Sequence, residues 1–190
     1  MRAFIAIELA PTIKDTLAKI QDGLKPCLPK VSWVKPRNLH LTLKFLGDIS
    51  PHQLKEIKRI IAEAGQETPA FKVKLDDLGV FPGLRQARII WAGISQDTAV
   101  KQLAEILEAK ISGIGIPKEK REFSSHITIA RVRNPIDPAD LETELKKGKN
   151  DLVGANLEFN AGGITLFESV LGTTQGPVYT VLEKANFNIT

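Results

Sequence analysis

The sequence is poor in the residues that would cross-link a chain or hold it in a membrane. Cys27 is the only cysteine among 190 residues, which excludes an internal disulfide and a cluster of thiolate metal ligands. The apolar runs are far shorter than the roughly 20 residues of a membrane span, and the first residues lead into a predicted strand rather than a signal peptide. We therefore expect a protein of the reducing cytoplasm that has no membrane partner.

A strong excess of one charge is also missing. The 26 Lys and Arg side chains are opposed by 22 Asp and Glu, which leaves a net charge of +4. This mild excess is compatible with a phosphate-bearing partner but does not establish one. The apolar content of 43% and charged content of 25% are those of an ordinary globular protein. We expect a single domain over residues 1–190, made of two interlocked lobes that share a core.

Histidine is scarce as well, yet two of the three His residues lie in the same setting. The stretch His40-Leu41-Thr42-Leu43 recurs 86 positions later as His126-Ile127-Thr128-Ile129. Polar and apolar residues alternate in both, which is the pattern of a strand with one polar and one buried face. We expect His40 and Thr42 to share one face of their strand, and His126 and Thr128 to share one face of theirs. His52 falls on the first turn of a predicted helix, where we expect it to be exposed.

The recurrence extends beyond the motifs to most of the chain. At the same offset Phe81 matches Phe167, and residues 2–81 and 88–167 form an approximate internal repeat. Each copy predicts a strand, a helix, a second strand and a second helix. We therefore expect a bilobal α+β fold in which a pseudo-two-fold axis relates the lobes and the motif strands face each other across a central cleft.

Periodicity and turn residues predict the individual elements. Helices are expected to begin at Pro11, at Ser50 with Gln53 in a capping box, near Asp97, and at Asp137, the last being short and ending at residues 148–150. Besides the two motif strands, strands are expected over residues 2–8, 71–75, 78–81, 88–94, 157–161, 164–170 and 178–184.

Two His-x-Thr strands around one centre predict acid–base chemistry at phosphorus. An imidazole with a pKa of about 6.5 can accept or donate a proton, so one His can deprotonate a nucleophile while the other protonates a leaving group. A Thr hydroxyl two places on can donate to an oxygen that gains charge in the transition state. In-line displacement needs the two groups on opposite sides, which a two-fold pair supplies. The residues alone thus predict phosphodiester cleavage without a metal or a covalent intermediate.

The same stretches resemble known signatures. Residues 38–47, NLHLTLKFLG, resemble the first signature of the two-histidine phosphoesterase superfamily, and residues 125–131, SHITIAR, resemble its second. Residues 2–8, 166–169 and 176–179 are similar to its branch of RNA 2′,3′-cyclic phosphodiesterases, also called RNA 2′-5′ ligases. The resemblance spans nearly the whole chain.

This resemblance implies an activity and roles for the residues. It implies a bilobal fold and hydrolysis of a terminal RNA 2′,3′-cyclic phosphate to a 2′-phosphomonoester without a cofactor. It also implies reversible, ATP-independent ligation of RNA halves, such as tRNA halves, through a 2′-5′ bond. His40 would be the proton donor and His126 the proton acceptor, an assignment that the residues alone leave open. The expected partner is an RNA terminus bearing the cyclic phosphate, and the expected state is a monomer.

Further side chains are candidates for binding the substrate. Lys44 shares strand parity with the first motif, so it is expected either to reach a phosphate or to be solvated at the end of the strand. Arg131 matches a recurrent Arg of the family, but its parity groups it with the apolar face of its strand. Either a bulge turns it toward the phosphate or it supports the strand from behind. Phe123 or Trp33 could stack on a base, with core packing as the alternative.

Rival interpretations remain open at this level. A non-catalytic module that binds RNA or a nucleotide phosphate would be expected to use Arg and Lys where the motifs have His and Thr. A zinc site would need a carboxylate or Cys ligand that neither motif contains. A related enzyme acting on a small cyclic phosphate would use the same residues, so the sequence does not identify the natural substrate.

Overall fold

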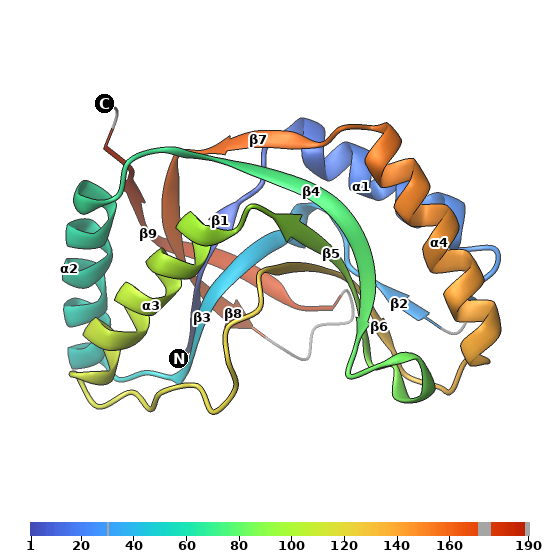
Figure 1. Ribbon diagram of the computed structural model, residues 1–190. Coiled ribbons are helices and arrows are strands. Elements are labelled where there is room, and N and C mark those ends of the chain that lie inside the picture. Colours follow the sequence, from blue (N-terminus) through green and yellow to red (C-terminus); the bar gives the residue numbers. More distant parts are fainter. Residues whose placement is uncertain (30, 171–175, 189–190) are drawn as a thin grey trace.

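The computed structural model describes residues 1–29, 31–170 and 176–188, and over these ranges the chain has the predicted α+β fold (Figure 1). The helices are α1 (Pro11–Leu24), α2 (Pro51–Glu67), α3 (Thr98–Ser112) and α4 (Pro138–Gly154). The strands are β1 (Arg2–Glu8), β2 (Val31–Trp33), β3 (His40–Asp48), β4 (Phe71–Phe81), β5 (Ile89–Ser95), β6 (His126–Val132), β7 (Glu158–Ala161), β8 (Gly163–Val170) and β9 (Val178–Asn186). None of the described helices combines the length and the apolar character needed to cross a membrane.

The strands form two antiparallel sheets. The order is β3-β1-β8-β9 in the four-stranded sheet and β2-β6-β5-β4-β7 in the five-stranded sheet. The first His-x-Thr motif lies at the start of β3 and the second at the start of β6. Because β3 and β6 also contact each other, the two motif strands meet where the sheets come together.

The elements repeat along the chain, but the two lobes do not divide it at its midpoint. At the offset of 86 residues β1, α1 and β3 correspond to β5, α3 and β6. In space α1 packs against α4 beside the five-stranded sheet, whereas α3 packs against α2 and contacts β3 of the other sheet (Figure 1). Likewise β4 pairs with β5, and β8 pairs with β1. Each sheet with its two helices, here called a lobe, therefore contains elements of both repeats.

The start of α2 has the predicted capping box. The backbone N–H of Gln53 donates to Ser50 Oγ at 3.2 Å, and the backbone N–H of Ser50 donates to Gln53 Oε1 at 3.0 Å. Ile57 and Ile61 lie on the buried side of this helix. The cap and the apolar stripe together orient α2 against its sheet.

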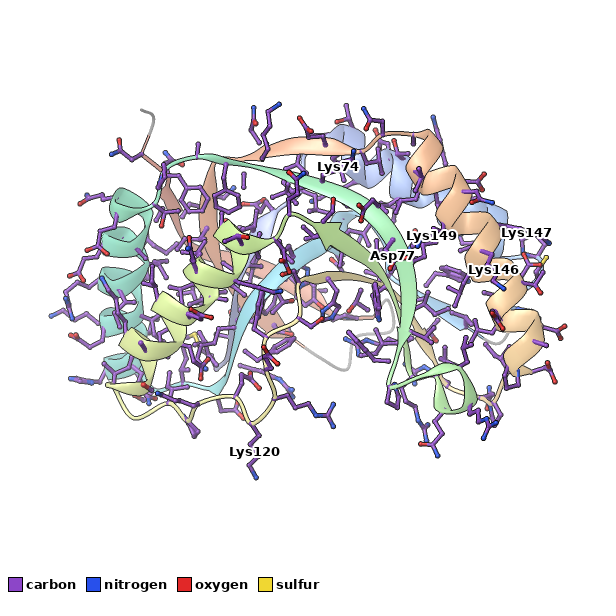
Figure 2. The ribbon with its side chains drawn as sticks, in the orientation of Figure 1. Lys74, Asp77, Lys120, Lys146, Lys147 and Lys149 are labelled. Atoms are coloured by element: carbon purple, nitrogen blue, oxygen red, sulfur yellow. The ribbon has the colours of Figure 1, made fainter. Side chains whose placement is uncertain are left out.

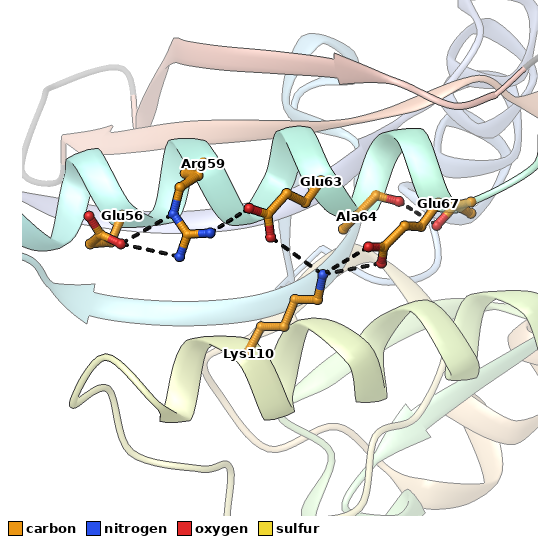
Figure 3. A network of polar contacts seen from close by, with 7 residues as sticks. Glu56, Arg59, Glu63, Ala64, Glu67 and Lys110 are labelled. Carbon is orange, nitrogen blue, oxygen red and sulfur yellow. Dashed lines mark hydrogen bonds and ion pairs between the residues drawn. The ribbon is translucent and has the colours of Figure 1, made fainter.

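Ion pairs on the surface join α2 to α3 (Figure 3). Lys110 Nζ of α3 lies 3.1 Å from Glu67 Oε2 and 3.6 Å from Glu63 Oε2, both on α2. Arg59 pairs with Glu56 and with Glu63 along α2 itself. Exposed pairs of this kind contribute about 0–1 kcal/mol each. The apolar faces of the two helices therefore supply most of the free energy of their packing.

Two element boundaries differ from the prediction. Helix α4 continues through Gly148 to Gly154, because Gly148 marks a close approach to α1 and β4 rather than a helix end. A Cβ at Gly148 would lie 2.8 Å from Leu78 Cδ1 and 3.3 Å from Leu24 Cδ1, so the missing side chain permits this packing. Strand β4 is one strand where two were predicted, with a shift of register in place of a break.

Candidate active site

A β-bulge interrupts each motif strand at the same place in the repeat. The pairing of β3 with β1 skips Leu43, and the pairing of β6 with β5 skips Ile129, 86 residues later. Each bulge directly follows the motif Thr and reverses the alternation of faces beyond it. The His and Thr of each motif keep a common face, whereas Lys44 and Phe45 of β3, and Ala130 and Arg131 of β6, lie on the face opposite to the one that strict alternation predicts.

The bulges decide where the two predicted phosphate-binding side chains lie. The Lys44 side chain is only 1% exposed, and its Nζ lies 2.6 Å from Glu108 Oε2 on α3. The expectation that Lys44 shares a face with His40 and Thr42 is therefore wrong. Arg131 is exposed and lines the cleft between the lobes. Of the two arrangements considered for Arg131, the structure has the one with the bulge.

The cleft between the lobes has a volume of about 790 Å³. Strand β3 contributes His40 and Thr42 to its lining, and β6 contributes Thr128. The described lining residues include no carboxylate, whereas four cations line it: Arg2, Lys35, Arg131 and Arg133. This one-sided charge gives the cleft a positive potential, which suits an anionic ligand.

His126 lies two residues before Thr128 on the same half-buried face of β6. It is not among the residues that line the cleft. Its charge nevertheless lowers the pKa of His40, so the two imidazoles lie within electrostatic reach of each other. The structure thus brings His40, Thr42, Thr128 and Arg131 into one cleft and holds His126 beside it.

Each imidazole is held by the carbonyl two residues before it. His40 Nδ1 lies 2.7 Å from the Asn38 carbonyl oxygen, and His126 Nδ1 lies 2.8 Å from that of Ser124. Since a carbonyl can only accept, Nδ1 carries a proton in both rings and Nε2 is left to act on a substrate. Asn38 and Ser124 are equivalent in the repeat, so the same local geometry sets both tautomers.

Burial lowers the pKa of His40 to about 4. The ring stacks on Phe4 with centroids 4.8 Å apart and meets Tyr179 edge-on at 5.4 Å, so a charged imidazole would lose its hydration. The cations of Lys14 and Arg131 act in the same direction. His40 is therefore neutral near pH 7 when the cleft holds no anion.

The surroundings of His126 repeat this arrangement in part. Phe81 meets His126 edge-on with centroids 5.1 Å apart, and its counterpart in the repeat, Phe167, lies 6.3 Å from His40. Burial lowers the pKa of His126 as well. Both rings can thus accept a proton near neutral pH, and whichever ring donates must first take one up.

The aromatic candidates differ in their exposure. Trp33 and Phe123 are half-buried and pack against the core, and Trp33 also lines the cleft. Phe45, which no sequence pattern singled out, is 59% exposed and lines the cleft as well. Its apolar character continues the alternation of Leu41 and Leu43, so the sequence of this segment carries no signal of the bulge that exposes it.

The motif histidines lack the neighbours that a metal ion would need. Nowhere in residues 1–29, 31–170 and 176–188 do three His, Cys, Asp or Glu side chains gather closely enough to hold an ion. The zinc alternative therefore lacks a ligand set at the motifs.

Known proteins share both the sequence pattern and the fold. The family model described as LigT like Phosphoesterase matches residues 7–91 and 93–179, two segments that begin at the offset of the internal repeat. A Methanocaldococcus jannaschii protein named RNA 2′,3′-cyclic phosphodiesterase is 36% identical over 97% of this chain and 99% of its own length. A protein of the same name from Methanothermobacter thermautotrophicus is 31% identical over 96% of this chain and 97% of its own length.

Solved structures extend the similarity to three dimensions. A Thermus thermophilus protein superposes with a TM-score of 0.81 at 28% identity, covering 98% of both chains. E. coli LigT in complex with 3′-AMP superposes with a TM-score of 0.78, also at 28% identity, over 98% of this chain and 97% of that one. The similarity in each case covers both lobes and the cleft between them.

Proposed function

Because this chain belongs to the LigT-like phosphoesterase family, and is thus a phosphodiesterase, we propose that it hydrolyses the terminal 2′,3′-cyclic phosphate of RNA to a 2′-phosphomonoester. Relatives at 31% and 36% identity carry the name of that activity. The observation that carries the proposal is the pair of equivalent His-x-Thr strands meeting at one cationic cleft.

In the proposed step, Nε2 of His126 accepts a proton from water as the water oxygen attacks phosphorus. The bond between phosphorus and O3′ breaks, and Nε2 of His40, in its protonated form, gives a proton to O3′. The hydroxyls of Thr42 and Thr128 donate to the non-bridging oxygens, where negative charge grows. One water is consumed, and proton exchange with solvent restores both imidazoles.

The low pKa of His40 couples this step to substrate binding. A donor His40 has to acquire a proton that it lacks near pH 7 in the free protein. A phosphodiester anion beside the ring favours the imidazolium and raises its pKa. Binding of the substrate and uptake of a proton by His40 are therefore one linked event.

Arg131 is proposed as the phosphate contact, since its side chain lines the cleft and a guanidinium can donate two parallel hydrogen bonds to a phosphate. Both proton transfers and the stabilisation of charge are assigned to side chains. We accordingly propose a reaction without a metal or a cofactor.

Ligation follows from the same chemistry with a different nucleophile. If the 5′-hydroxyl of a second RNA strand replaces water, its oxygen forms a bond to phosphorus while the bond to O3′ breaks. The product is a 2′-5′ phosphodiester, and ATP is not needed because the cyclic phosphate supplies the leaving group. The number of phosphodiester bonds is conserved, which makes the step reversible.

An oligoribonucleotide that ends in a 2′,3′-cyclic phosphate tests the proposal, in assays with and without a chelator. The expected product is a terminal monoester that resists a 3′-specific phosphatase, formed at a rate that the chelator leaves unchanged. A 3′-phosphate product would reverse the assigned bond while sparing the acid–base pair. Activity lost to the chelator and restored by zinc would refute the metal-free mechanism.

A further inference from the structure

The ion pair between Lys44 and Glu108 takes no part in the proposed chemistry, but it fixes a loop beside the cleft. Lys44 Nζ lies 2.6 Å from Glu108 Oε2 and 3.4 Å from the Pro117 carbonyl oxygen. Glu108 Oε1 accepts a hydrogen bond of 2.7 Å from the backbone N–H of Glu119. A buried ion pair adds little net stability by itself. Its effect here is to join β3 and α3 to the loop at residues 116–121, through Pro117 and Glu119.

This loop brings cations to the rim of a second cavity, which has a volume of about 510 Å³. The cavity is lined by Phe45 and its neighbours on β3 and by residues 116–121. The loop contributes Lys118, Lys120 and Arg121 against the single carboxylate of Glu119. Figure 2 shows Lys120 extending from the loop away from the rest of the protein. The second cavity is therefore positively charged.

Phe45 connects this cavity to the cleft. Phe45 and Gly47 line both of them. The Phe45 side chain is 59% exposed, although a ring of this size contributes most when it is buried. An exposed aromatic ring flanked by cations is the arrangement that proteins use to hold single-stranded nucleic acid, through base stacking and phosphate contacts.

A third cavity, beside the second motif, has the opposite charge. It has a volume of about 470 Å³ and is lined by Ser124 and Ser125, directly before His126. Its charged lining residues are mostly acidic: Asp76, Asp77, Asp97, Glu122 and Lys101. A phosphate backbone would be repelled there and attracted toward Phe45. The charge distribution therefore gives a strand one favourable direction out of the cleft.

We propose that Phe45 and residues 118–121 bind the RNA strand on the 5′ side of the nucleotide that bears the cyclic phosphate. Phe45 stacks on a base, and Lys118, Lys120 and Arg121 contact the phosphates. Lys44 is a positioning residue, because it holds the loop that carries these cations. The inference rests on the proposed function, and it makes an oligoribonucleotide rather than a cyclic mononucleotide the preferred substrate class.

The test compares kcat/KM for 2′,3′-cyclic AMP with kcat/KM for a short oligoribonucleotide ending in a 2′,3′-cyclic phosphate. One variant is Phe45→Ala, and another replaces Lys118, Lys120 and Arg121 by Ala. A matched control replaces three cations of α4 on the other lobe, Lys146, Lys147 and Lys149, by Ala (Figure 2). In both test variants kcat/KM should fall about 10-fold for the oligoribonucleotide and less than about twofold for cyclic AMP. In the control variant neither value should change.

An equal loss on both substrates, no loss on the oligoribonucleotide, or an equal loss in the control would overturn the proposal. Fluorescence anisotropy with an oligoribonucleotide carrying a 2′-phosphate provides a second test that does not need turnover. The test variants should bind it more weakly, and the loop variant should show a shallower salt dependence. If the unaltered protein hydrolyses neither substrate, the proposed function fails, while anisotropy still decides whether the binding site exists.

Discussion

Lys44 points away from the cleft that Arg131 lines, although strict strand alternation predicts the reverse for both side chains. The cause is the bulge that follows the motif Thr in each strand. Beyond the bulges, Phe45 of β3 occupies the position that Arg131 has in β6. The pseudo-symmetric site therefore presents a ring from one strand and a guanidinium from the other. This asymmetry suits an RNA strand whose terminal phosphate lies at Arg131 and whose preceding nucleotides lie along Phe45.

Removing either imidazole should abolish most of the activity. We expect His40→Ala and His126→Ala each to lower kcat by about 100-fold or more, because each removes one proton-transfer group. Thr42→Ala and Thr128→Ala should lower kcat by a smaller factor, since each removes one hydrogen bond to the charge that develops in the transition state. Steady-state kinetics on a cyclic phosphate measures these losses. His52→Ala, at an exposed His of α2, is the control, and full activity in either motif His variant would refute the mechanism.

Removing the guanidinium should weaken the hold on the phosphate. Arg131→Ala should lower kcat/KM for 2′,3′-cyclic AMP by about 10-fold or more. Arg131→Lys should recover only part of this kcat/KM, because a lysine cannot donate the two parallel hydrogen bonds of a guanidinium. Arg85→Ala removes the same charge from an exposed turn and should leave the kinetics unchanged. Equal kinetics in the Arg131→Ala variant and the unaltered protein would exclude a phosphate contact.

Lys44 should matter for stability rather than for the phosphate. Lys44→Met removes the cation that pairs with Glu108 and should lower the free energy of unfolding by about 3 kcal/mol, measured by urea denaturation. Adding Glu108→Gln should recover part of this loss. The kcat/KM for 2′,3′-cyclic AMP should stay within about threefold, since the side chain points away from the cleft. A 10-fold loss on that substrate would instead indicate that Lys44 does reach the phosphate.

The rate should depend on pH as a bell-shaped curve. The acid limb reports protonation of the base, proposed as His126, and the alkaline limb reports loss of the proton from the acid, proposed as His40. Because the bound phosphate raises the pKa of His40, the alkaline limb of kcat should lie at higher pH than that of kcat/KM. Profiles from about pH 4 to 9 measure both limbs. Coincident alkaline limbs would contradict the coupling, and a rate rising throughout would exclude the acid–base pair.

Stability should fall in acid because His40 is buried in its neutral form. Its pKa is about 4 in the folded protein, against about 6.5 in the unfolded chain, so the unfolded state binds more protons between these values. The contribution of His40 to the free energy of unfolding should therefore be complete above about pH 6.5. The free energy of unfolding should decrease by about 3 kcal/mol as the pH falls toward 4. Urea denaturation across this range measures the slope. His40→Gln should flatten it, and an unchanged slope would show that other groups cause the loss.

Local sequence patterns were enough to predict the motif strands, the start of α2 and the duplication. Alternation identified the motif strands, the Ser50–Gln53 cap located the start of α2, and matching positions 86 residues apart revealed the duplication. These features could be predicted because each depends on residues close together in the chain, or on a direct comparison of one half with the other. The resemblance of the motifs to a known family pointed to the chemistry in the same way.

Only the tertiary structure decided which side chains face the substrate and in what state. A bulge is defined by pairing with a neighbouring strand, so the placements of Lys44 and Arg131 depend on β1 and β5 rather than on their own segments. The packing of α1 against α4, and of α3 against α2, places each helix beside the sheet that does not contain its own repeat's first strand, and it depends on contacts between distant elements. The low pKa of His40 comes from burial beside Phe4 and Tyr179, which lie far from it along the chain. Desolvation and long-range packing are properties of the assembled fold, and no local pattern encodes them.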